Sequence, residues 1–328
     1  MEKKHKTVLI FGVSGQDGSL LANFLINKGY KVHGTSRNTE VADFNSLKKL
    51  NILQKLKLHS IKLTDFKNIS NLINDVQPDE IYNLSGQSSV GESFQKPIET
   101  FNSIAIVSIN ILEAIRASKS AIRFYSACSS ECFGDTKGIA ADEYTAFNPQ
   151  SPYAISKATA FWQVSNYRKN YKLYVCSGIL FNHESPFRSE KFVTRKIISS
   201  AVRIKLGSKE KVLLGDLSIK RDWGWAPEYV EAMWLMLQQK FPDDFVIASG
   251  ESNSLENFVK ITFDKLGLNW QDHVEIDKKL FRSLDIRQSF ANVSKANKNL
   301  QWFASTKMKE VISKMIKADL EIFSKFNL

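Results

Sequence analysis

The sequence KTVLIFGVSGQDG, residues 6–18, decides the fold of this chain. It begins with a short apolar run, which is typical of a strand buried on both faces. Glycines then recur at every third residue, and the helical spacing of apolar residues begins directly after them. Such glycines permit a tight turn and the close approach of a pyrophosphate to the helix N-terminus. A turn without a ligand is the alternative, but the flanking strand and helix favour a dinucleotide site. The predicted cofactor-binding residues are Gly12, Gly15, Gln16, Asp17 and Gly18.

Short apolar runs and helical periods alternate through the following 160 or so residues. Further strands are expected at 30–37, 56–61, 80–84, 122–127 and 174–180. Helices are expected at 19–28, 66–75, 97–117 and 152–171. This order predicts an α/β fold, a Rossmann-type doubly wound parallel sheet with helices on both faces.

The regularity weakens after residue 181. Helices are expected at 192–206 and 227–239, and a late strand at 245–248. We predict a cofactor-binding domain over residues 1–181, rejoined by roughly 217–248. The rest of 182–328 is expected to be a smaller C-terminal α/β substrate-binding domain that caps the carboxyl edge of the sheet.

Composition excludes several classes of protein. The 328 residues carry a net charge of +11, but no basic stripe interleaved with aromatic residues indicates a nucleic-acid surface. No apolar run reaches the ~18–20 residues that span a bilayer, so we expect no membrane partner. The N-terminus imitates a signal peptide, but its apolar stretch is short and lacks a small-residue cleavage site. Three cysteines cannot form a disulfide framework, which favours a cytoplasmic location.

The end of the second predicted strand distinguishes between the two common nicotinamide dinucleotides. An acidic residue there binds the ribose hydroxyls of NAD, whereas a cation accommodates the 2′-phosphate of NADP. The stretch Thr35-Ser36-Arg37-Asn38 has no acid before Glu40. We therefore expect NADP, with Arg37 at its phosphate. A solvated loop arginine is the alternative.

A tyrosine and a lysine lie four residues apart in SPYAISK, residues 151–157. Side chains at i and i+4 share a helix face, and a lysine ammonium beside a phenol is expected to lower the tyrosine pKa toward neutrality. Tyr153 is then a base for a substrate hydroxyl proton, supported by Lys157. Ser129, after the fifth strand, is placed to bond the same hydroxyl. Together with the glycine loop, this set resembles the extended short-chain dehydrogenase/reductase superfamily.

Glu131 distinguishes dehydration from plain oxidation and reduction. A carboxylate beside a newly formed ketone can remove the acidified proton from the next carbon. An exposed loop carboxylate is the alternative. The predicted catalytic residues are thus Ser129, Glu131, Tyr153 and Lys157.

Several longer strings make the resemblance specific. They are EIYNL (80–84), SPYAISK (151–157), GILFNHESP (178–186), FVTRKI (192–197), KRDWG (220–224) and YVEAMWLMLQ (229–238). They resemble the GDP-mannose 4,6-dehydratase family, and the similarity extends from residue 6 to about residue 320.

The resemblance implies that a GDP-hexose, most simply GDP-mannose, is oxidised at carbon 4, loses water across carbons 5 and 6, and is reduced at carbon 6 by the same NADP. Tyr153 takes the hydroxyl proton and Glu131 the carbon 5 proton. Lys157 also holds the nicotinamide ribose, and Leu84 lies at the cofactor. The substrate-binding residues that the resemblance implies are Ser88, Asn182, Arg188, Lys196, Arg221, Arg282 and Asp285.

The chain also departs from the family pattern. Where the family has a threonine, a histidine and an arginine, this chain has Ser129, Ser89 and Gln150. The last two changes leave a GDP-manno-heptose open as the substrate. Asn38 and Lys62 also depart from the family at the cofactor. Two further functions stay open on the same fold, a 4-reductase or epimerase and a non-catalytic nucleotide-binding protein.

The resemblance implies a homodimer or homotetramer, in which the helices at 97–117 and 152–171 meet a partner subunit. Burial of their apolar faces within one subunit is the alternative. No metal site is expected, because Cys128 and Cys132 have no paired Cys or His cluster. They are interpreted as small residues lining the site. His183 either shapes its loop or packs in the core.

Overall fold

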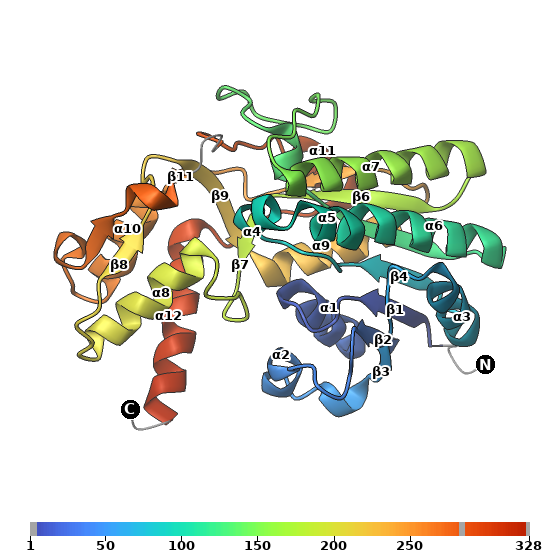
Figure 1. The fold of residues 1–328 in the computed structure, drawn as a ribbon, viewed down its shortest axis with the longest axis horizontal. Helices are drawn as coiled ribbons and strands as arrows, with labels where there is room; N and C mark the ends of the chain where they lie inside the picture. The colour runs from blue at the N-terminus through green and yellow to red at the C-terminus, as the bar shows by residue number, and fades with distance from the viewer. Residues whose placement is uncertain (1–4, 282–285, 326–328) are drawn as a thin grey trace.

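A seven-stranded parallel sheet organises the computed structural model, which describes residues 5–281 and 286–325. The strand order is β10-β6-β5-β4-β1-β2-β3 (Figure 1). The strands are β1 (Thr7–Phe11), β2 (Lys31–Ser36), β3 (Lys57–Ser60), β4 (Glu80–Asn83), β5 (Arg123–Ser129), β6 (Val175–Leu180) and β10 (Phe245–Ile247). The chain returns to the centre between β3 and β4, and ligands bind at the carboxyl edge beside such a reversal. The predicted doubly wound α/β fold is confirmed.

Helices cover both faces of this sheet (Figure 1). On one face α1 (Gln16–Asn27) packs against α9 (Ala226–Gln238), and α2 (Asn45–Lys49) and α11 (Ser294–Leu300) lie beside them. On the other face α6 (Val107–Ser118) packs between α3 (Phe66–Val76) and α7 (Pro152–Tyr171). The core therefore forms two apolar layers, one on each side of the sheet.

The predicted helix at 97–117 is continuous but not uniform. It consists of α5 (Pro97–Phe101), a π-helical turn (Asn102–Ile106) and α6, and a short helix, α4 (Val90–Gln95), precedes it. Among the described residues, 97–118 is the one helical stretch long and apolar enough to cross a bilayer, and half of it is buried. It packs against α3 and α7, as core helices do.

A smaller body follows α7 and β6. It holds α8 (Val193–Lys205), α10 (Leu255–Lys265) and α12 (Met308–Lys325), with the paired strands β8 (Val212–Leu214) and β12 (Val274–Ile276). These helices share one apolar cluster, distinct from the layers of the main sheet. A three-stranded sheet of β7 (Asn182–Glu184), β9 (Lys220–Trp225) and β11 (Ser252–Ser254) joins the two bodies.

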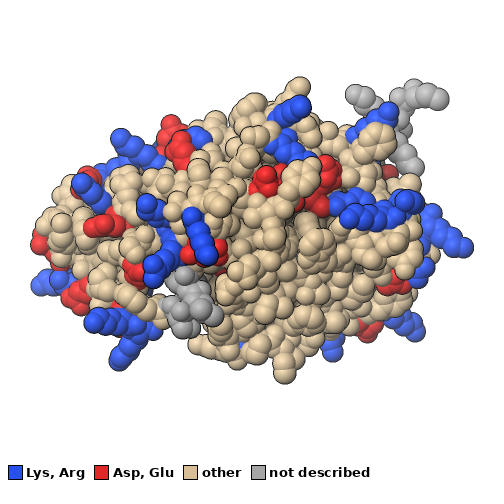
Figure 2. All heavy atoms as spheres, turned by 90° about the horizontal axis from the view of Figure 1, so that it is seen from above, with Lys and Arg blue, Asp and Glu red and all other residues tan. Residues whose placement is uncertain are grey.

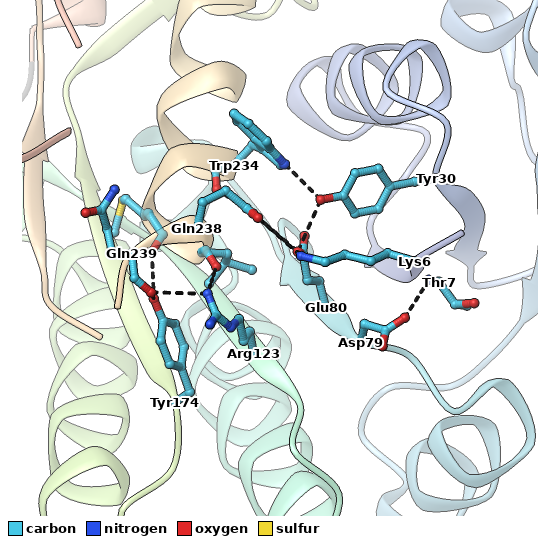
Figure 3. Close-up of polar contacts among 12 residues, drawn as sticks. Lys6, Thr7, Tyr30, Asp79, Glu80, Arg123, Tyr174, Trp234, Gln238 and Gln239 are labelled. Atoms are coloured by element: carbon cyan, nitrogen blue, oxygen red, sulfur yellow. Dashed lines mark hydrogen bonds and ion pairs between the residues drawn. The ribbon is translucent and has the colours of Figure 1, made fainter. Parts of the chain in front are cut away.

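The amino edge of the main sheet is held by a buried carboxylate (Figure 3). Glu80 begins β4 and is fully buried. Its oxygens accept hydrogen bonds from Lys6 at 2.9 Å, Tyr82 at 2.9 Å, Gln238 at 3.2 Å and Tyr30 at 3.3 Å. Because Gln238 ends α9, this network fixes that helix to the edge of the sheet opposite the carboxyl ends of the strands.

Candidate active site

A cavity of about 410 Å³ lies at the carboxyl edge of the main sheet and is also lined by the smaller body. It follows the ends of β4, β5 and β6 and reaches the loops around β7, β8 and β9. It brings together the four predicted catalytic residues, Ser129, Glu131, Tyr153 and Lys157. It also brings together the predicted ligand-binding residues Asp17, Leu84, Ser88, Asn182, Arg188, Lys196 and Arg221. Arg282 and Asp285 lie outside the described residues.

The glycine loop has the shape that its sequence predicts. Gly12 has φ +86°, and a Cβ on Gly18 would lie 2.2 Å from the Gly12 carbonyl oxygen, so a side chain there is sterically excluded. α1 then begins at Gln16 with Gly15 as its N-cap and no side-chain cap. The first N–H groups of the helix are therefore left for an anion, as a pyrophosphate requires.

Two residues of this loop also contact β7 and the residue that follows it. The Gln16 amide donates to the His183 carbonyl at 3.2 Å and accepts from the Ser185 hydroxyl at 2.8 Å. Asp17 lies 2.9 Å from His183 Nε2. The start of α1 is thus tied to β7 and to the residue that follows it.

Arg37 lies away from this cavity, directly after β2. It is exposed and lines a separate surface hollow together with Ser60 and Lys62. This hollow lies at the carboxyl ends of β2 and β3, next to the strand that precedes the glycine loop. Two cations, Arg37 and Lys62, thus line one hollow at this edge of the sheet, and Asp75 lines it as well.

Local sequence places the tyrosine and lysine on the first turns of α7. Ser151 caps the helix by accepting from the Ala154 N–H at 3.1 Å, and Pro152 occupies its first turn. Tyr153 and Lys157 are both buried and project from one face toward the end of β5. The Lys157 ammonium donates to the Ala127 carbonyl at 2.7 Å and lies 5.9 Å from the Tyr153 ring centre.

The prediction that Lys157 lowers the pKa of Tyr153 is wrong for the protein without ligands. Burial raises the pKa of this phenol well above its ordinary value, and the hydrogen bond with Ser129 lowers it only in part. The negative charge of Glu131 adds to the rise. Lys157 does not offset this, because burial lowers the pKa of its own ammonium and one of its N–H groups donates to the Ala127 carbonyl.

Glu131 lies two residues after Ser129, in the turn that follows β5. β5 ends at Ser129, whose side chain accepts from the Glu131 N–H at 3.3 Å and so starts a 3₁₀ turn, Ser130–Phe133. This turn directs Glu131 to the cavity that Tyr153 also lines. A hydroxyl, a phenol and a carboxylate therefore face one space.

Cations surround the other end of the cavity. The Arg188 guanidinium stacks on the Phe192 ring at 3.6 Å, and its Nε lies 3.5 Å from the Glu184 carboxylate. Arg221 is buried and donates to the Ile286 carbonyl at 2.6 Å. Lys196 reaches the Leu213 carbonyl at 2.7 Å.

Sequence reasoning missed further lining residues. Lys191, Gln87 and Asp216 also face the cavity. Lys191 lies between the two segments that carried the family resemblance, and a count of cations over residues 182–196 would have found it. Asp216 precedes β9 in a loop, where no sequence signal distinguishes it from a solvated carboxylate.

Comparisons with known proteins agree with this geometry. Residues 9–315 match the family model described as GDP-mannose 4,6 dehydratase. The chain is 44% identical to GDP-mannose 4,6 dehydratase 1 of Arabidopsis thaliana, over 98% of this chain and 91% of that protein. It is 39% identical to the human GDP-mannose 4,6 dehydratase, with 98% and 93% covered. Its fold matches dTDP-glucose 4,6-dehydratase of Bacillus anthracis, solved in complex with NAD, with a TM-score of 0.85 and 18% identity over 97% and 98% of the chains. The chain therefore belongs to the GDP-mannose 4,6-dehydratase family, as its sequence strings predict.

Proposed function

We propose that this protein is a hydro-lyase that converts a GDP-hexose, most simply GDP-mannose, to its 4-keto-6-deoxy derivative. One observation carries the proposal: Ser129, Glu131 and Tyr153 face a single cavity whose far end is lined by arginines. Membership in the GDP-mannose 4,6-dehydratase family and the names of its relatives support the same activity.

A nicotinamide dinucleotide fits the residues of the glycine loop. Gly12 and Gly18 leave space that a Cβ would fill, and the first turn of α1 has no side-chain cap. When bound, such a cofactor accepts a hydride from the sugar and later returns it. Arg37 and Lys62 support the choice of NADP, because two exposed cations line one hollow at the ribose end.

The side chains of the cavity divide the proton chemistry between them. Ser129 orients the carbon 4 hydroxyl, and Tyr153 receives its proton. Because burial raises the pKa of Tyr153, the bare protein holds a neutral phenol there. The phenolate therefore depends on positive charge that arrives with the ligands, in addition to Lys157. Glu131 then takes the carbon 5 proton and, directly or through a relay, gives a proton to the hydroxyl of carbon 6, which leaves as water.

Arginine suits the diphosphate because its planar fork bonds two phosphate oxygens at once. Arg188 and Arg221 are both largely buried, so a phosphate bound there is shielded from water. Asn182 at the start of β7 adds a neutral donor beside them. In this proposal the smaller body supplies the substrate side of the cavity and the main sheet the cofactor side.

The test is direct. The purified protein is incubated with GDP-mannose and NADP⁺, and the product is measured by mass. Loss of one water with no net NADPH supports the dehydratase, whereas an isomer of unchanged mass indicates an epimerase. A parallel incubation with GDP-manno-heptose tests the alternative substrate, which Ser89 supports because this small residue replaces the family's histidine and lines the cavity; Gln150, the other departure, is not among the lining residues. No loss of water from either sugar would reject the proposal.

We also propose a homodimer or homotetramer built on the face of α4, α5 and α7. Figure 2 shows a wide expanse without charged side chains on this side of the molecule. The exposed large apolar residues of these neighbouring helices include Phe94, Ile98, Phe101, Ile155 and Trp162. Apolar patches of this kind mark protein interfaces, and a second copy of the chain is the occupant that the family resemblance implies.

Sedimentation velocity tests the assembly. Trp162→Glu and Ile98→Glu should each convert the native species to a monomer, because they place a charge within the patch. Phe241→Glu is the matched control, since Phe241 is similarly exposed but lies after α9. A monomeric native protein would reject this part of the proposal.

A further inference from the structure

Two buried thiols meet beside the catalytic loop. Cys128 Sγ and Cys132 Sγ lie 3.7 Å apart, one on the penultimate residue of β5 and the other in the 3₁₀ turn that follows. Both cysteines are free, and Cys128 lines the active-site cavity. The residues between them include Ser129 and Glu131, which the proposed reaction uses. The thiol pair therefore brackets the catalytic loop.

The same pair also contacts the helix that carries the proposed base. Cys132 Sγ lies 3.6 Å from the Ala154 carbonyl, and Cys128 Sγ lies 4.0 Å from the Lys157 carbonyl. Tyr153 belongs to this same turn of α7. A covalent bond between the sulfurs would thus affect both the turn that carries Glu131 and the first turns of α7, which carry Tyr153.

We infer that Cys128 and Cys132 form a reversible disulfide when the protein meets a hydroperoxide, and that this bond inactivates the site. Cys128 reacts first because its sulfur borders the cavity, whereas Cys132 is fully buried. The Cys128 sulfur attacks the peroxide, an S–O bond forms as the O–O bond breaks, and the displaced hydroxide leaves as water with the proton of the thiol, so that Cys128 becomes a sulfenic acid. The Cys132 sulfur then attacks Cys128 Sγ, the S–O bond breaks, and the second water leaves. Two thiols and one peroxide give one disulfide and two waters.

Inactivation follows from the geometry. A disulfide requires an S–S distance of about 2.0 Å, so the two sulfurs, now 3.7 Å apart, must move closer together. Residues 129–131 lie between the two cysteines, so we expect the bridge to tighten this loop and to displace Ser129 and Glu131. Displacement of a catalytic group by about 1 Å can lower turnover about 100-fold. A small dithiol reverses the reaction by thiol–disulfide exchange.

The test has a chemical and a catalytic readout. The native protein is treated with hydrogen peroxide, its remaining thiols are alkylated, and its peptides are mapped by mass. A bridge between Cys128 and Cys132 is expected, with about 100-fold lower turnover in proportion to the bridged fraction. Dithiothreitol should restore both. Free thiols at both positions after peroxide, or full turnover in the bridged protein, would overturn the inference.

Three variants make the result specific. Cys176→Ala should behave as the native protein, because Cys176 lies on β6 with its sulfur against the Phe124 carbonyl. Cys132→Ala should form no bridge, and dimedone should instead label Cys128. The turnover of Cys128→Ala, whatever its basal value, should not change with peroxide. The effect on turnover rests on the proposed function, but the bridge does not. If the reduced protein fails to dehydrate GDP-mannose, the peptide map still decides the inference.

Discussion

His183 and Asp17 form a buried ion pair that joins the substrate side of the site to the cofactor loop. His183 Nε2 lies 2.9 Å from Asp17 Oδ2, and His183 Nδ1 lies 2.7 Å from the Phe181 carbonyl. Both neighbours are acceptors, so both ring nitrogens donate and the ring is an imidazolium. Burial alone would lower the pKa of His183, but the charge of Asp17 and its hydrogen bond raise it. For Asp17, burial is likewise outweighed by His183, which lowers the carboxyl pKa to about 2.

The pair predicts a stability profile with a maximum in mildly acidic solution. Because the folded pKa of His183 is raised, its contribution is complete below its ordinary value of 6.5 and declines as the pH rises through the folded value. Because the folded pKa of Asp17 is about 2 instead of 3.8, its contribution is complete above 3.8 and declines as the pH falls toward 2. The ion pair therefore contributes fully between about pH 4 and 6.5.

Asp17→Asn tests this profile by urea unfolding at pH 5.5 and pH 8.5. Removing one partner of a buried pair should cost about 3–5 kcal/mol at pH 5.5. The cost should be smaller at pH 8.5, where His183 loses part of its charge. Asp264→Asn, an exposed carboxylate on α10, is the matched control and should change stability at neither pH. An equal cost for Asp17→Asn at both values would contradict the ion pair.

Glu131→Gln should separate cofactor binding from dehydration. The amide keeps the size of the carboxylate but cannot take a proton, so we expect a loss of turnover of about 10²–10⁴-fold. NADPH affinity, measured by fluorescence titration, should stay within twofold of native, roughly within 0.4 kcal/mol. Glu143→Gln is the control, because Glu143 accepts from the Val246 N–H and does not line the cavity. Unchanged dehydration in Glu131→Gln would remove this residue from the mechanism.

Alanine at two glycines of one loop should affect the melting temperature differently, although both substitutions should weaken dinucleotide binding. A methyl group on Gly18 would lie 2.2 Å from the Gly12 carbonyl oxygen, so Gly18→Ala should lower the melting temperature and abolish NADPH binding. A methyl group on Gly15 meets its nearest neighbour at 3.5 Å, which is ordinary contact. Gly15→Ala should therefore keep the native melting temperature and weaken only the dinucleotide. If Gly15→Ala binds NADPH as the native protein does, the pyrophosphate does not lie on this turn.

The local motifs could be predicted from the sequence because their geometry is set within a few residues. The glycine loop and the Tyr153–Lys157 spacing both occur in the structure where their patterns place them. The sequence places Ser129 just after a strand at 122–127, whereas β5 continues to Ser129 as its last residue. The longer sequence strings shared with the family predicted most of the lysines and arginines that line the cavity.

The contacts between distant segments could not be predicted. The His183–Asp17 pair joins residues 166 positions apart, and no local pattern indicates such a contact. The pKa of Tyr153 was predicted in the wrong direction because the sequence shows the neighbouring lysine but not the burial of the phenol. The sequence indicates either that His183 shapes its loop or that it packs in the core. The structure shows both roles, since its ring bonds Asp17 and also stacks on Tyr229 with ring centres 4.5 Å apart.

Arg37 should determine the choice between NADP and NAD. Losing one charge-assisted contact to the 2′-phosphate should weaken NADPH about tenfold in Arg37→Ala and leave NADH affinity unchanged. Lys31→Ala is the control, because Lys31 is an exposed cation at the opposite end of the same strand. Equal weakening of both dinucleotides would assign Arg37 to the adenosine instead of the phosphate.

Substitution of Glu80 tests the stability of the fold without changing a residue of the active-site cavity. Glu80→Ala removes a fully buried acceptor shared by Lys6, Tyr30, Tyr82 and Gln238, so unfolding should become easier by about 3–5 kcal/mol. Glu92→Ala breaks an exposed pair with Lys96 and should cost less than about 1 kcal/mol. Because Glu80 begins β4 and the cavity lies at the other end of the strands, turnover per folded molecule should stay native in both variants. A turnover that falls with Glu80→Ala at a temperature where the protein is still folded would show that the amino edge of the sheet positions the catalytic edge.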